Sequence, residues 1–157
     1  FGLARDLNIR PQEAEQYKEM YFEKFPRVRD FMQKSIKSAR KLGFVSTLLN
    51  RRRYIPDISS RNFHSRSFAE RAAINTPIQG SAADIIKIAM VKVHEDLIKK
   101  GFKTRLILQV HDELLFDVPS EELENIIPVI KEAMETAVKL KVPLTVDFKK
   151  AYTWDQL

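Results

Sequence analysis

The first part of the chain repeats its apolar positions with the period of an α-helix. Within residues 11–25 the apolar side chains recur three or four positions apart, at Ala14, Tyr17, Met20, Tyr21 and Phe25. Pro26 interrupts the pattern, and a second run with the same spacing then reaches Gly43, a suitable C-cap. The spacing therefore predicts two amphipathic helices that are separated at the proline.

A β-hairpin is expected after these helices. The segment FVSTLLNRRRYIPDI, residues 44–58, combines strand-forming residues with Asn50 at a turn position and Pro56 at its end. The triplet Arg51–Arg53 lies at the tip, where we expect water to surround it.

Helical spacing returns over residues 62–100. We expect this helix to break at Pro77 and Gly80, because proline lacks the N–H that the helical ladder needs and glycine weakens a helix interior. Ser81, with Asp84 three residues later, resembles a capping box and predicts that a new helix begins there.

The last third of the chain predicts two strands, a helix and a final strand. Residues 104–118 are apolar on both sides of the polar centre His111-Asp112-Glu113, which predicts a hairpin. From Pro119 a helix is expected to bury Leu123, Ile126, Ile127, Ile130, Met134 and Ala137. The segment VPLTVDF, residues 142–148, predicts a short strand. This order of elements predicts an α+β fold, with an antiparallel sheet packed on long helices.

The composition narrows the class of protein. At 157 residues, with 44% hydrophobic and 31% charged residues, the chain resembles one globular domain. The absence of cysteine excludes disulfides and thiolate metal sites. No apolar run approaches the ~20 residues that cross a bilayer, so we expect no membrane partner. Because the sequence opens with phenylalanine and with a helical pattern, we expect it to belong to a longer protein.

The formal net charge of +6 is unevenly distributed along the chain. Lysine and arginine crowd into residues 27–71, whereas residues 112–135 are acidic. A basic segment favours polyanionic partners, although a run of charge is also typical of an ordinary solvated surface.

The polar centre of the predicted C-terminal hairpin is the first candidate for chemistry. Carboxylate oxygens suit a hard divalent ion, so Asp112 is a candidate ligand for Mg²⁺, with Glu113 as a weaker ligand or a supporting group. The alternative is a polar turn between two core strands, in which Asp112 caps backbone amides. The spacing alone leaves both interpretations open.

A second candidate set lies on one face of the predicted long helix. Arg71, Asn75 and Gln79 recur every four residues, and the residues around them are small. Hydrogen-bonding side chains in a row over such a surface suit the acceptors in a DNA minor groove. The alternative is a buried polar stripe that satisfies neighbouring loops.

Several segments of the chain, taken together, point to one family. Residues 66–84 (RSFAERAAINTPIQGSAAD) and 106–116 (LILQVHDELLF) resemble the two most recognisable C-terminal blocks of family A DNA polymerases, the bacterial DNA polymerase I family. The opening FGLARDLNI resembles the segment after that family's nucleotide-binding fingers helix. RRRYIPDI and VPLTVDF…TWDQL match its pattern as well, so the resemblance covers essentially the whole chain.

The resemblance implies a role for each candidate residue. Asp112 resembles the palm aspartate that binds the catalytic Mg²⁺ ions, Glu113 the acidic residue beside it, and His111 a residue near the primer terminus. The residues that resemble the palm-helix contacts to primer–template DNA are Arg71, Asn75 and Gln79.

The same resemblance implies the organisation of the chain and its partners. Residues 1–58 correspond to the end of the fingers and residues 59–157 to the rest of the palm. The expected partners are primer–template DNA, deoxynucleoside triphosphates and the upstream remainder of the polymerase, in a bacterial cytoplasm close to the nucleoid. Two Mg²⁺ ions are expected in the complete site, with a second aspartate from upstream of this chain. We therefore expect the isolated chain to be inactive.

Two other functions remain open at this point. One is a stand-alone basic DNA-binding module in which Asp112 is only structural. The other is a small metal-dependent phosphohydrolase centred on His111 and Asp112.

Overall fold

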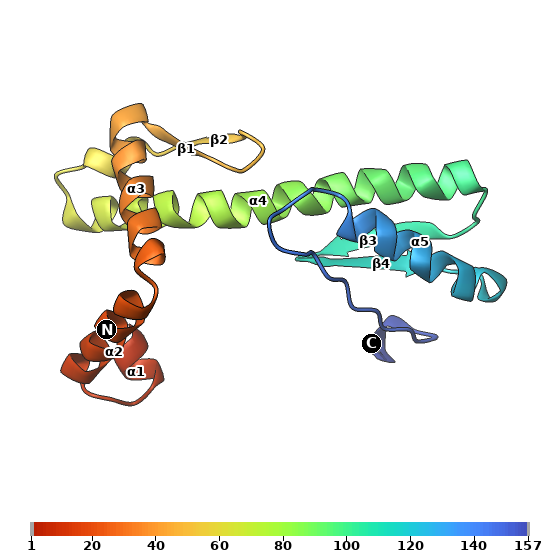
Figure 1. Ribbon diagram of the computed structural model, residues 1–157, viewed down its shortest axis with the longest axis horizontal. Helices are drawn as coiled ribbons and strands as arrows, with labels where there is room; N and C mark the ends of the chain where they lie inside the picture. Colours follow the sequence, from red (N-terminus) through yellow and green to blue (C-terminus); the bar gives the residue numbers. More distant parts are fainter. Residues whose placement is uncertain (1, 157) are drawn as a thin grey trace. The chain divides into compact units, whose positions relative to one another are not determined.

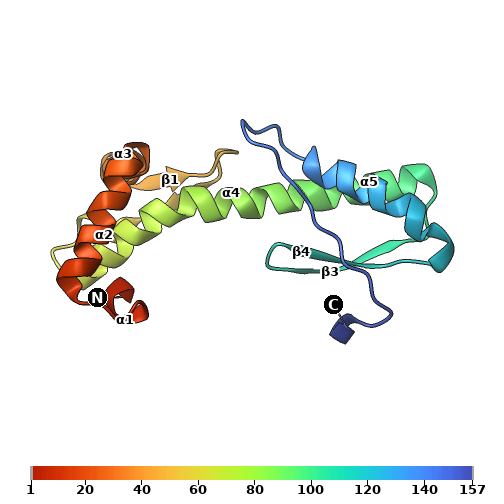
Figure 2. The same ribbon diagram turned by 60° about the horizontal axis from the view of Figure 1, so that its bottom comes forward.

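The structure is a computed structural model that describes residues 2–156 (Figures 1 and 2). Two motif residues lie outside the described residues: Phe1, the first residue of FGLARDLNI, and Leu157, the last residue of TWDQL. The chain divides into two compact units, the first running to Ile78 and the second beginning at Gln79. Each unit has a hydrophobic core of its own.

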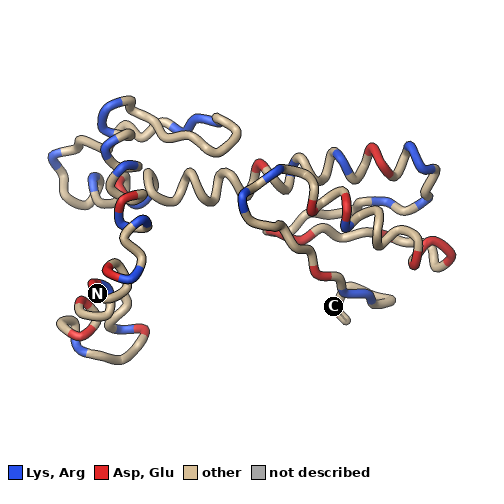
Figure 3. The backbone as a smooth tube through the Cα atoms, viewed as in Figure 1, with Lys and Arg blue, Asp and Glu red and all other residues tan. Residues whose placement is uncertain are grey.

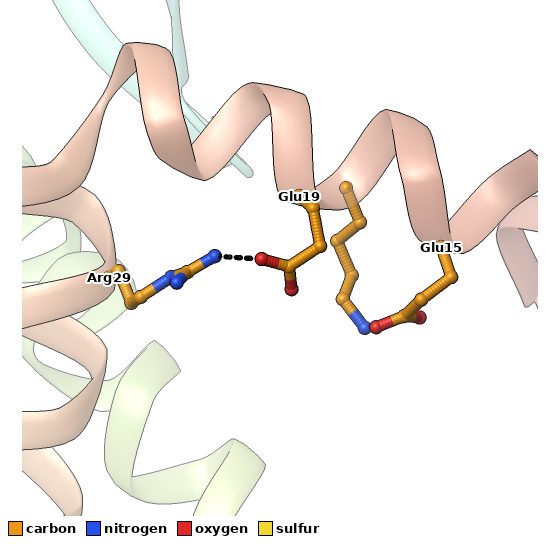
Figure 4. Close-up of polar contacts among 4 residues, drawn as sticks. Glu15, Glu19 and Arg29 are labelled. Atoms are coloured by element: carbon orange, nitrogen blue, oxygen red, sulfur yellow. Dashed lines mark hydrogen bonds and ion pairs between the residues drawn. The ribbon is translucent and has the colours of Figure 1, made fainter.

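The first unit begins with three helices, two of which the apolar spacing predicts. They are α1 (Gly2–Asp6), α2 (Pro11–Lys24) and α3 (Pro26–Leu42). Proline is the first residue of both α2 and α3, where its missing N–H costs no helical hydrogen bond. Arg29 of α3 forms an ion pair with Glu19 of α2, which joins the two helices across the proline (Figure 4).

The predicted β-hairpin follows α3. Strand β1 (Phe44–Ser46) pairs antiparallel with β2 (Arg52–Tyr54), and a short 3₁₀ helix, η1 (Pro56–Ser59), comes next. The hydroxyl of Thr47 accepts hydrogen bonds from the backbone N–H groups of Leu49 and Arg51 in the turn. The core joins α3, the hairpin, η1 and the start of the next helix through Ala39, Val45, Ile55, Ile58, Ala69 and Ala73.

Helix α4 (Phe63–Lys100) is continuous, so the predicted break at Pro77 is wrong. The residue before the proline supplies local support: the Thr76 hydroxyl donates to the Ala72 carbonyl at 2.7 Å and accepts from Arg53 of β2 at 3.2 Å. An interior proline costs a helix about 3 kcal/mol. Burial of the surrounding helix face outweighs that local preference.

The start of α4 also differs in part from the prediction. The Asn62 side-chain oxygen caps the helix by accepting hydrogen bonds from the backbone N–H groups of His64 and Ser65. Ser81 and Asp84, which predict a second start, are buried inside the continuous helix at 5% and 3% exposure. Their pattern is that of a capping box, but the helix does not begin there.

The second unit packs a hairpin and a helix on the C-terminal half of α4. Strand β3 (Arg105–Val110) pairs antiparallel with β4 (Glu113–Asp117), and η2 (Ser120–Glu122), α5 (Leu123–Glu135) and η3 (Trp154–Gln156) follow. Helix α5 runs alongside α4 (Figures 1 and 2). Their shared core consists of Val93, Leu97, Ile126, Ile130 and Ala133, with Phe102, Phe116 and Val118 packed against it.

Two local interactions fix where β3 begins. Gly101, at φ 73°, ends α4, and the N–H of Phe102 bonds back to the Leu97 carbonyl at 3.0 Å, as in a Schellman motif. The Glu122 carboxylate then accepts hydrogen bonds from the backbone N–H groups of Lys103 and Thr104, at 2.8 and 2.9 Å, and from the Thr104 hydroxyl at 2.7 Å. One side chain from η2 therefore holds the segment that leads into the hairpin.

Residues 142–148 do not form a strand, so the prediction of a last strand is wrong. The backbone N–H of Val146 instead donates to the Glu135 carboxylate of α5 at 3.0 Å. A second contact with α5 is the ion pair between Lys150 and Glu124, at 3.7 Å. A side-chain carboxylate thus accepts the hydrogen bond that a neighbouring strand would accept in a sheet. The predicted class, α+β with antiparallel pairing, is confirmed as two separate hairpins among helices.

The Glu122 contacts predict a specific dependence of stability on pH. The Lys103 backbone N–H, helped by Thr104 and opposed by partial desolvation, holds the pKa of Glu122 below its usual value. The resulting stabilisation is fully present above the ordinary glutamate pKa and is lost as pH falls through the lower folded value. We expect Glu122→Gln to lower the melting temperature of this chain at neutral pH, and to flatten its decline between pH ~6 and ~3.

Glu121→Gln is the matched control, because Glu121 is exposed and only approaches Lys103 at 4.0 Å. Melting curves across this pH range compare the two variants. Equal slopes for Glu122→Gln and the unchanged chain would contradict the assigned role.

Candidate functional site

The candidate catalytic residues lie at the tip of the β3–β4 hairpin. Val110 pairs with Glu113 and Gln109 with Leu114, so the loop consists of only two residues, His111 and Asp112. The predicted hairpin around these residues is confirmed: His111 and Asp112 form its loop, and Glu113 is the first residue of β4. All three side chains are exposed.

The backbone of this tip is strained. His111 has φ 53°, in the left-handed region, and among the described residues other than glycine only Asn8 and Asn50 share a positive φ. Asparagine and histidine occur there more often than most residues, but a side chain still carries a steric penalty of about 1–2 kcal/mol that glycine lacks. A positive φ at the first loop position alone is the pattern of a type II′ turn, which glycine normally occupies.

A β-bulge also interrupts strand β3, further from the hairpin tip. The register shifts between Leu106, opposite Phe116, and Leu108, opposite Leu115, so Ile107 is an extra residue in β3. Such bulges re-aim the side chains that follow and increase local twist. The orientation of the tip therefore depends on the bulge as well as on the turn.

The tip offers carboxylate oxygens of the kind that Mg²⁺ prefers. Asp112 and Glu113 are adjacent and exposed. Among residues 2–156, no three His, Cys, Asp or Glu side chains come together as a group that could hold a metal ion. Proteins often hold Mg²⁺ with one or two carboxylates, completed by waters and substrate phosphates. The donor chemistry of these two carboxylates is therefore of a kind that can bind Mg²⁺.

Helix α4 carries the second candidate set. Arg71, Asn75 and Gln79 lie at intervals of four residues in the continuous helix, and all three are exposed. Within residues 2–156 these side chains are open to solvent, and their role as DNA contacts stays a prediction. The buried side chains of this part of the helix are Ala73 and Thr76. The continuity of α4 through Pro77 is what keeps the three residues at regular helical spacing.

The part of α4 that carries Asn75 and Gln79 has no charged side chains. Between Arg71 and Asp84 the helix carries no charged side chain, which is visible as an uncoloured stretch in Figure 3. The Arg71 guanidinium donates to the Ser67 hydroxyl at 2.8 Å and lies 6.0 Å from the Phe68 ring centre. Asn75 and Gln79 therefore have no charged residue of α4 within three positions on either side.

Several basic residues of the first unit contact other groups of the same unit. Arg52 lies 4.7 Å from the Phe44 ring centre, and Arg66 donates to the Ser60 carbonyl at 2.9 Å. Arg53 contacts Thr76. This pattern is compatible with a solvated basic surface and adds little to the choice among functions.

Sequence reasoning missed two residues that shape the hairpin. Gln109 donates a side-chain hydrogen bond to the His111 carbonyl at the tip, and Glu122 binds the base. An amide side chain two residues before a turn is a usable signal. The role of Glu122 depends on contacts between residues 18 and 19 positions apart and has no local signal.

No helix in the described part of the chain combines the length and the apolar character that crossing a membrane requires.

Comparison with known families defines the class. The family model for DNA polymerase family A matches residues 1–156, and the chain belongs to that family. It is 53% identical over 154 residues to DNA polymerase I of Bacillus caldotenax and to DNA polymerase I of Lactococcus lactis subsp. lactis (strain IL1403). Each match covers 98% of this chain but only 18% of the relative's length.

A solved structure has the same fold. The POL domain of Pol1 from M. smegmatis, in complex with DNA primer-template and dNTP, matches with a TM-score of 0.89 and 48% sequence identity. The match covers 92% of this chain and 25% of that one. The predicted family and fold class are confirmed, and the chain spans less than a fifth of the length of these curated relatives.

The strain at His111 predicts the effect of a glycine at this position. We expect His111→Gly to raise the free energy of unfolding of this chain by up to about 1 kcal/mol, because the steric penalty exceeds the entropic cost of glycine. Denaturant unfolding measures the difference. Glu113→Gly, at an ordinary strand position two residues away, is the control and should destabilise by about 0.5–1 kcal/mol. Equal destabilisation by both glycines would show that His111 is not strained in solution.

Proposed function

We propose that this chain is the C-terminal part of a DNA-directed DNA polymerase that adds deoxynucleotides to a primer 3′ end. One observation carries the proposal: a chain of family A folds its LILQVHDELLF segment into a hairpin with an exposed Asp112 in a two-residue loop. In the proposed reaction the primer 3′ oxygen attacks the α-phosphorus of the incoming nucleotide. A new phosphodiester bond forms, and pyrophosphate leaves.

The proposed ligands are primer–template DNA and deoxynucleoside triphosphates. The related M. smegmatis POL domain was solved with DNA primer-template and dNTP, which supports the same partners here. We assign Arg71, Asn75 and Gln79 to the minor-groove edge of the primer–template duplex. Both A·T and G·C pairs present acceptors there, so donor side chains can bind every correct pair.

We assign the Mg²⁺ of the reaction to Asp112, with Glu113 as its supporting acidic neighbour. Bound Mg²⁺ would stabilise the negative charge that develops on the transferred phosphoryl group. Asp112 would hold its carboxylate at a fixed place at the sheet end, and Glu113 would add negative charge beside it. His111 would lie close to the primer terminus.

The rest of the active site would come from outside these residues. We assign residues 1–58 to the end of the fingers and residues 59–157 to the palm, with the second metal-binding aspartate and the triphosphate-binding residues in the upstream remainder. Two-metal phosphoryl transfer needs carboxylates that bridge both ions, and Asp112 with Glu113 is an incomplete set. The isolated chain is therefore proposed to be inactive, and its complete form to work in a bacterial cytoplasm, near the nucleoid.

A DNA-binding module with a structural Asp112 is the alternative that one observation favours. The α4 residues Arg71, Asn75 and Gln79 are exposed and can bind DNA whatever Asp112 does. A substitution at Asp112 separates the two functions, because only the polymerase depends on that carboxylate.

We expect Asp112→Ala, in the complete polymerase that contains this chain, to lower the rate of primer extension with Mg²⁺ by about 100-fold or more. DNA affinity should change little, because Asp112 is assigned to the metal. Primer extension and DNA-binding titrations measure both quantities. Asp117→Ala, at the far end of the same hairpin, is the matched control and should extend normally. Undiminished extension by Asp112→Ala would leave the DNA-binding module as the better function.

The α4 row predicts a different effect. We expect Arg71→Ala and Gln79→Ala each to weaken primer–template binding by about 1–3 kcal/mol and to alter the extension of mismatched ends, because mispairs move the minor-groove acceptors. Arg27→Ala and Gln16→Ala, two exposed residues of the same types elsewhere, are the controls. Affinity and mismatch extension equal to those of the controls would remove the row from the DNA interface.

A further inference from the structure

Gln109 makes an unusual contact at the hairpin tip. It is the second-last residue of β3, opposite Leu114, and its side chain is exposed. Its side-chain Nε2 donates a hydrogen bond to the backbone carbonyl of His111, the first loop residue. An exposed strand residue therefore reaches forward and binds the backbone of the turn that follows it.

The His111 carbonyl that accepts this hydrogen bond belongs to the peptide group between His111 and Asp112, which lies outside the β3–β4 ladder. Val110 and Glu113, which flank the two-residue loop, are the last pair of residues in the ladder. The central peptide, between His111 and Asp112, lies outside it and can rotate. Rotation of this peptide converts type II′ into type I′ geometry, because it changes ψ of the first loop residue and φ of the second. The second loop residue is Asp112.

Packing among residues 2–156 does not hold the central peptide in place. The side chains of His111, Asp112 and Glu113 are all exposed, and the buried cluster of this unit reaches the hairpin only through Phe116 and Val118. His111 is strained at φ 53°, so the loop sequence itself does not favour the observed geometry. A hydrogen bond to the carbonyl is the interaction that selects one peptide orientation.

We propose that Gln109 is a positioning residue for Asp112. By holding the His111 carbonyl, its amide fixes the peptide that precedes Asp112, and so fixes the direction of the Asp112 carboxylate. The inference rests on the proposed function, in that the orientation matters for catalysis only if Asp112 acts in the polymerase. Gln109 itself touches neither nucleotide nor metal in this proposal.

The first measurement concerns the backbone and needs no activity. In this chain, the three-bond coupling between the N–H and Hα of Asp112 reports its φ by NMR. Gln109→Met keeps a long unbranched side chain and removes the donor. We expect the Asp112 coupling to shift toward the averaged value of a mobile turn, with the melting temperature nearly unchanged. An unchanged coupling would overturn the proposal.

The second measurement concerns catalysis in the complete polymerase. We expect Gln109→Met to lower the single-turnover rate of nucleotide incorporation by about 10- to 100-fold, the range expected for a displaced catalytic group, with unchanged DNA affinity. Arg105→Met, at the other end of β3, is the matched control. A shifted coupling with an unchanged incorporation rate would also overturn the proposal.

A double substitution tests the mechanism directly. Glycine at the first loop position favours type II′ geometry by itself. Gln109→Met should therefore lower the rate by less than about threefold when introduced into His111→Gly, compared with about tenfold or more in the unchanged chain. Equal losses in both backgrounds would mean that Gln109 does not act through the turn. Should Gln109→Met fold poorly, Gln109→Asn serves instead, because its shorter amide keeps the polarity but does not reach the carbonyl.

The design separates this inference from the proposed function. If Asp112→Ala leaves extension intact, the proposed function fails whatever Gln109 does. If Asp112→Ala abolishes extension while Gln109→Met leaves both the coupling and the rate unchanged, only the inference fails.

Discussion

The chemistry proposed for this chain depends on holding an exposed carboxylate still. A hairpin tip can do so only if its base is fixed, because an isolated two-stranded ribbon is barely stable in water. In the second unit the base is fixed twice. Phe116 and Val118 pack on the core between α4 and α5, and the Glu122 carboxylate binds the backbone where β3 begins. Asp112 is therefore exposed at the tip of a hairpin whose base is held in place.

This arrangement explains why apolar strands surround such polar residues. Leu114, Leu115 and Phe116 of β4 are partly buried, whereas the tip reaches solvent. A carboxylate that remained among the apolar side chains would lose its hydration at a cost of several kcal/mol. The short loop places it beyond them, where water, a cation or a phosphate-bound ion can solvate it. The strain at His111 is the consequence of making that loop only two residues long.

The sequence predicted the elements whose signals are local. Helical spacing identified α2 and α3, and the apolar runs around His111-Asp112-Glu113 identified the C-terminal hairpin. The errors arose where distant contacts outweigh local preference. Pro77 lies within a continuous helix because that helix face is buried and Thr76 joins Arg53, 23 residues away. Residues 142–148 have strand-like composition but bind a glutamate side chain of α5 instead of a strand.

The candidate site shows the same division between features with a local sequence signal and features that depend on the folded chain. The residue types and spacing of Asp112, Glu113 and the α4 row were readable from the sequence, and the family resemblance supplied their expected roles. The φ of His111 and the Gln109 hydrogen bond were not readable, because both are properties of the folded turn.

The uncharged stretch of α4 bears on how a polymerase can bind every correct base pair equally. Ionic side chains bind phosphates strongly and at any sequence, so they fix position but report little about the pairs themselves. Neutral donors such as Asn75 and Gln79 gain energy only when an acceptor lies at the right place and angle. In the proposed assignment, their place between Arg71 and Asp84, on a stretch without charge, would make their hydrogen bonds sensitive to acceptor position. A helix that broke at Pro77 would put Gln79 out of register with Arg71 and Asn75. In the proposed assignment, the continuity of α4 would therefore matter for DNA binding as well as for folding.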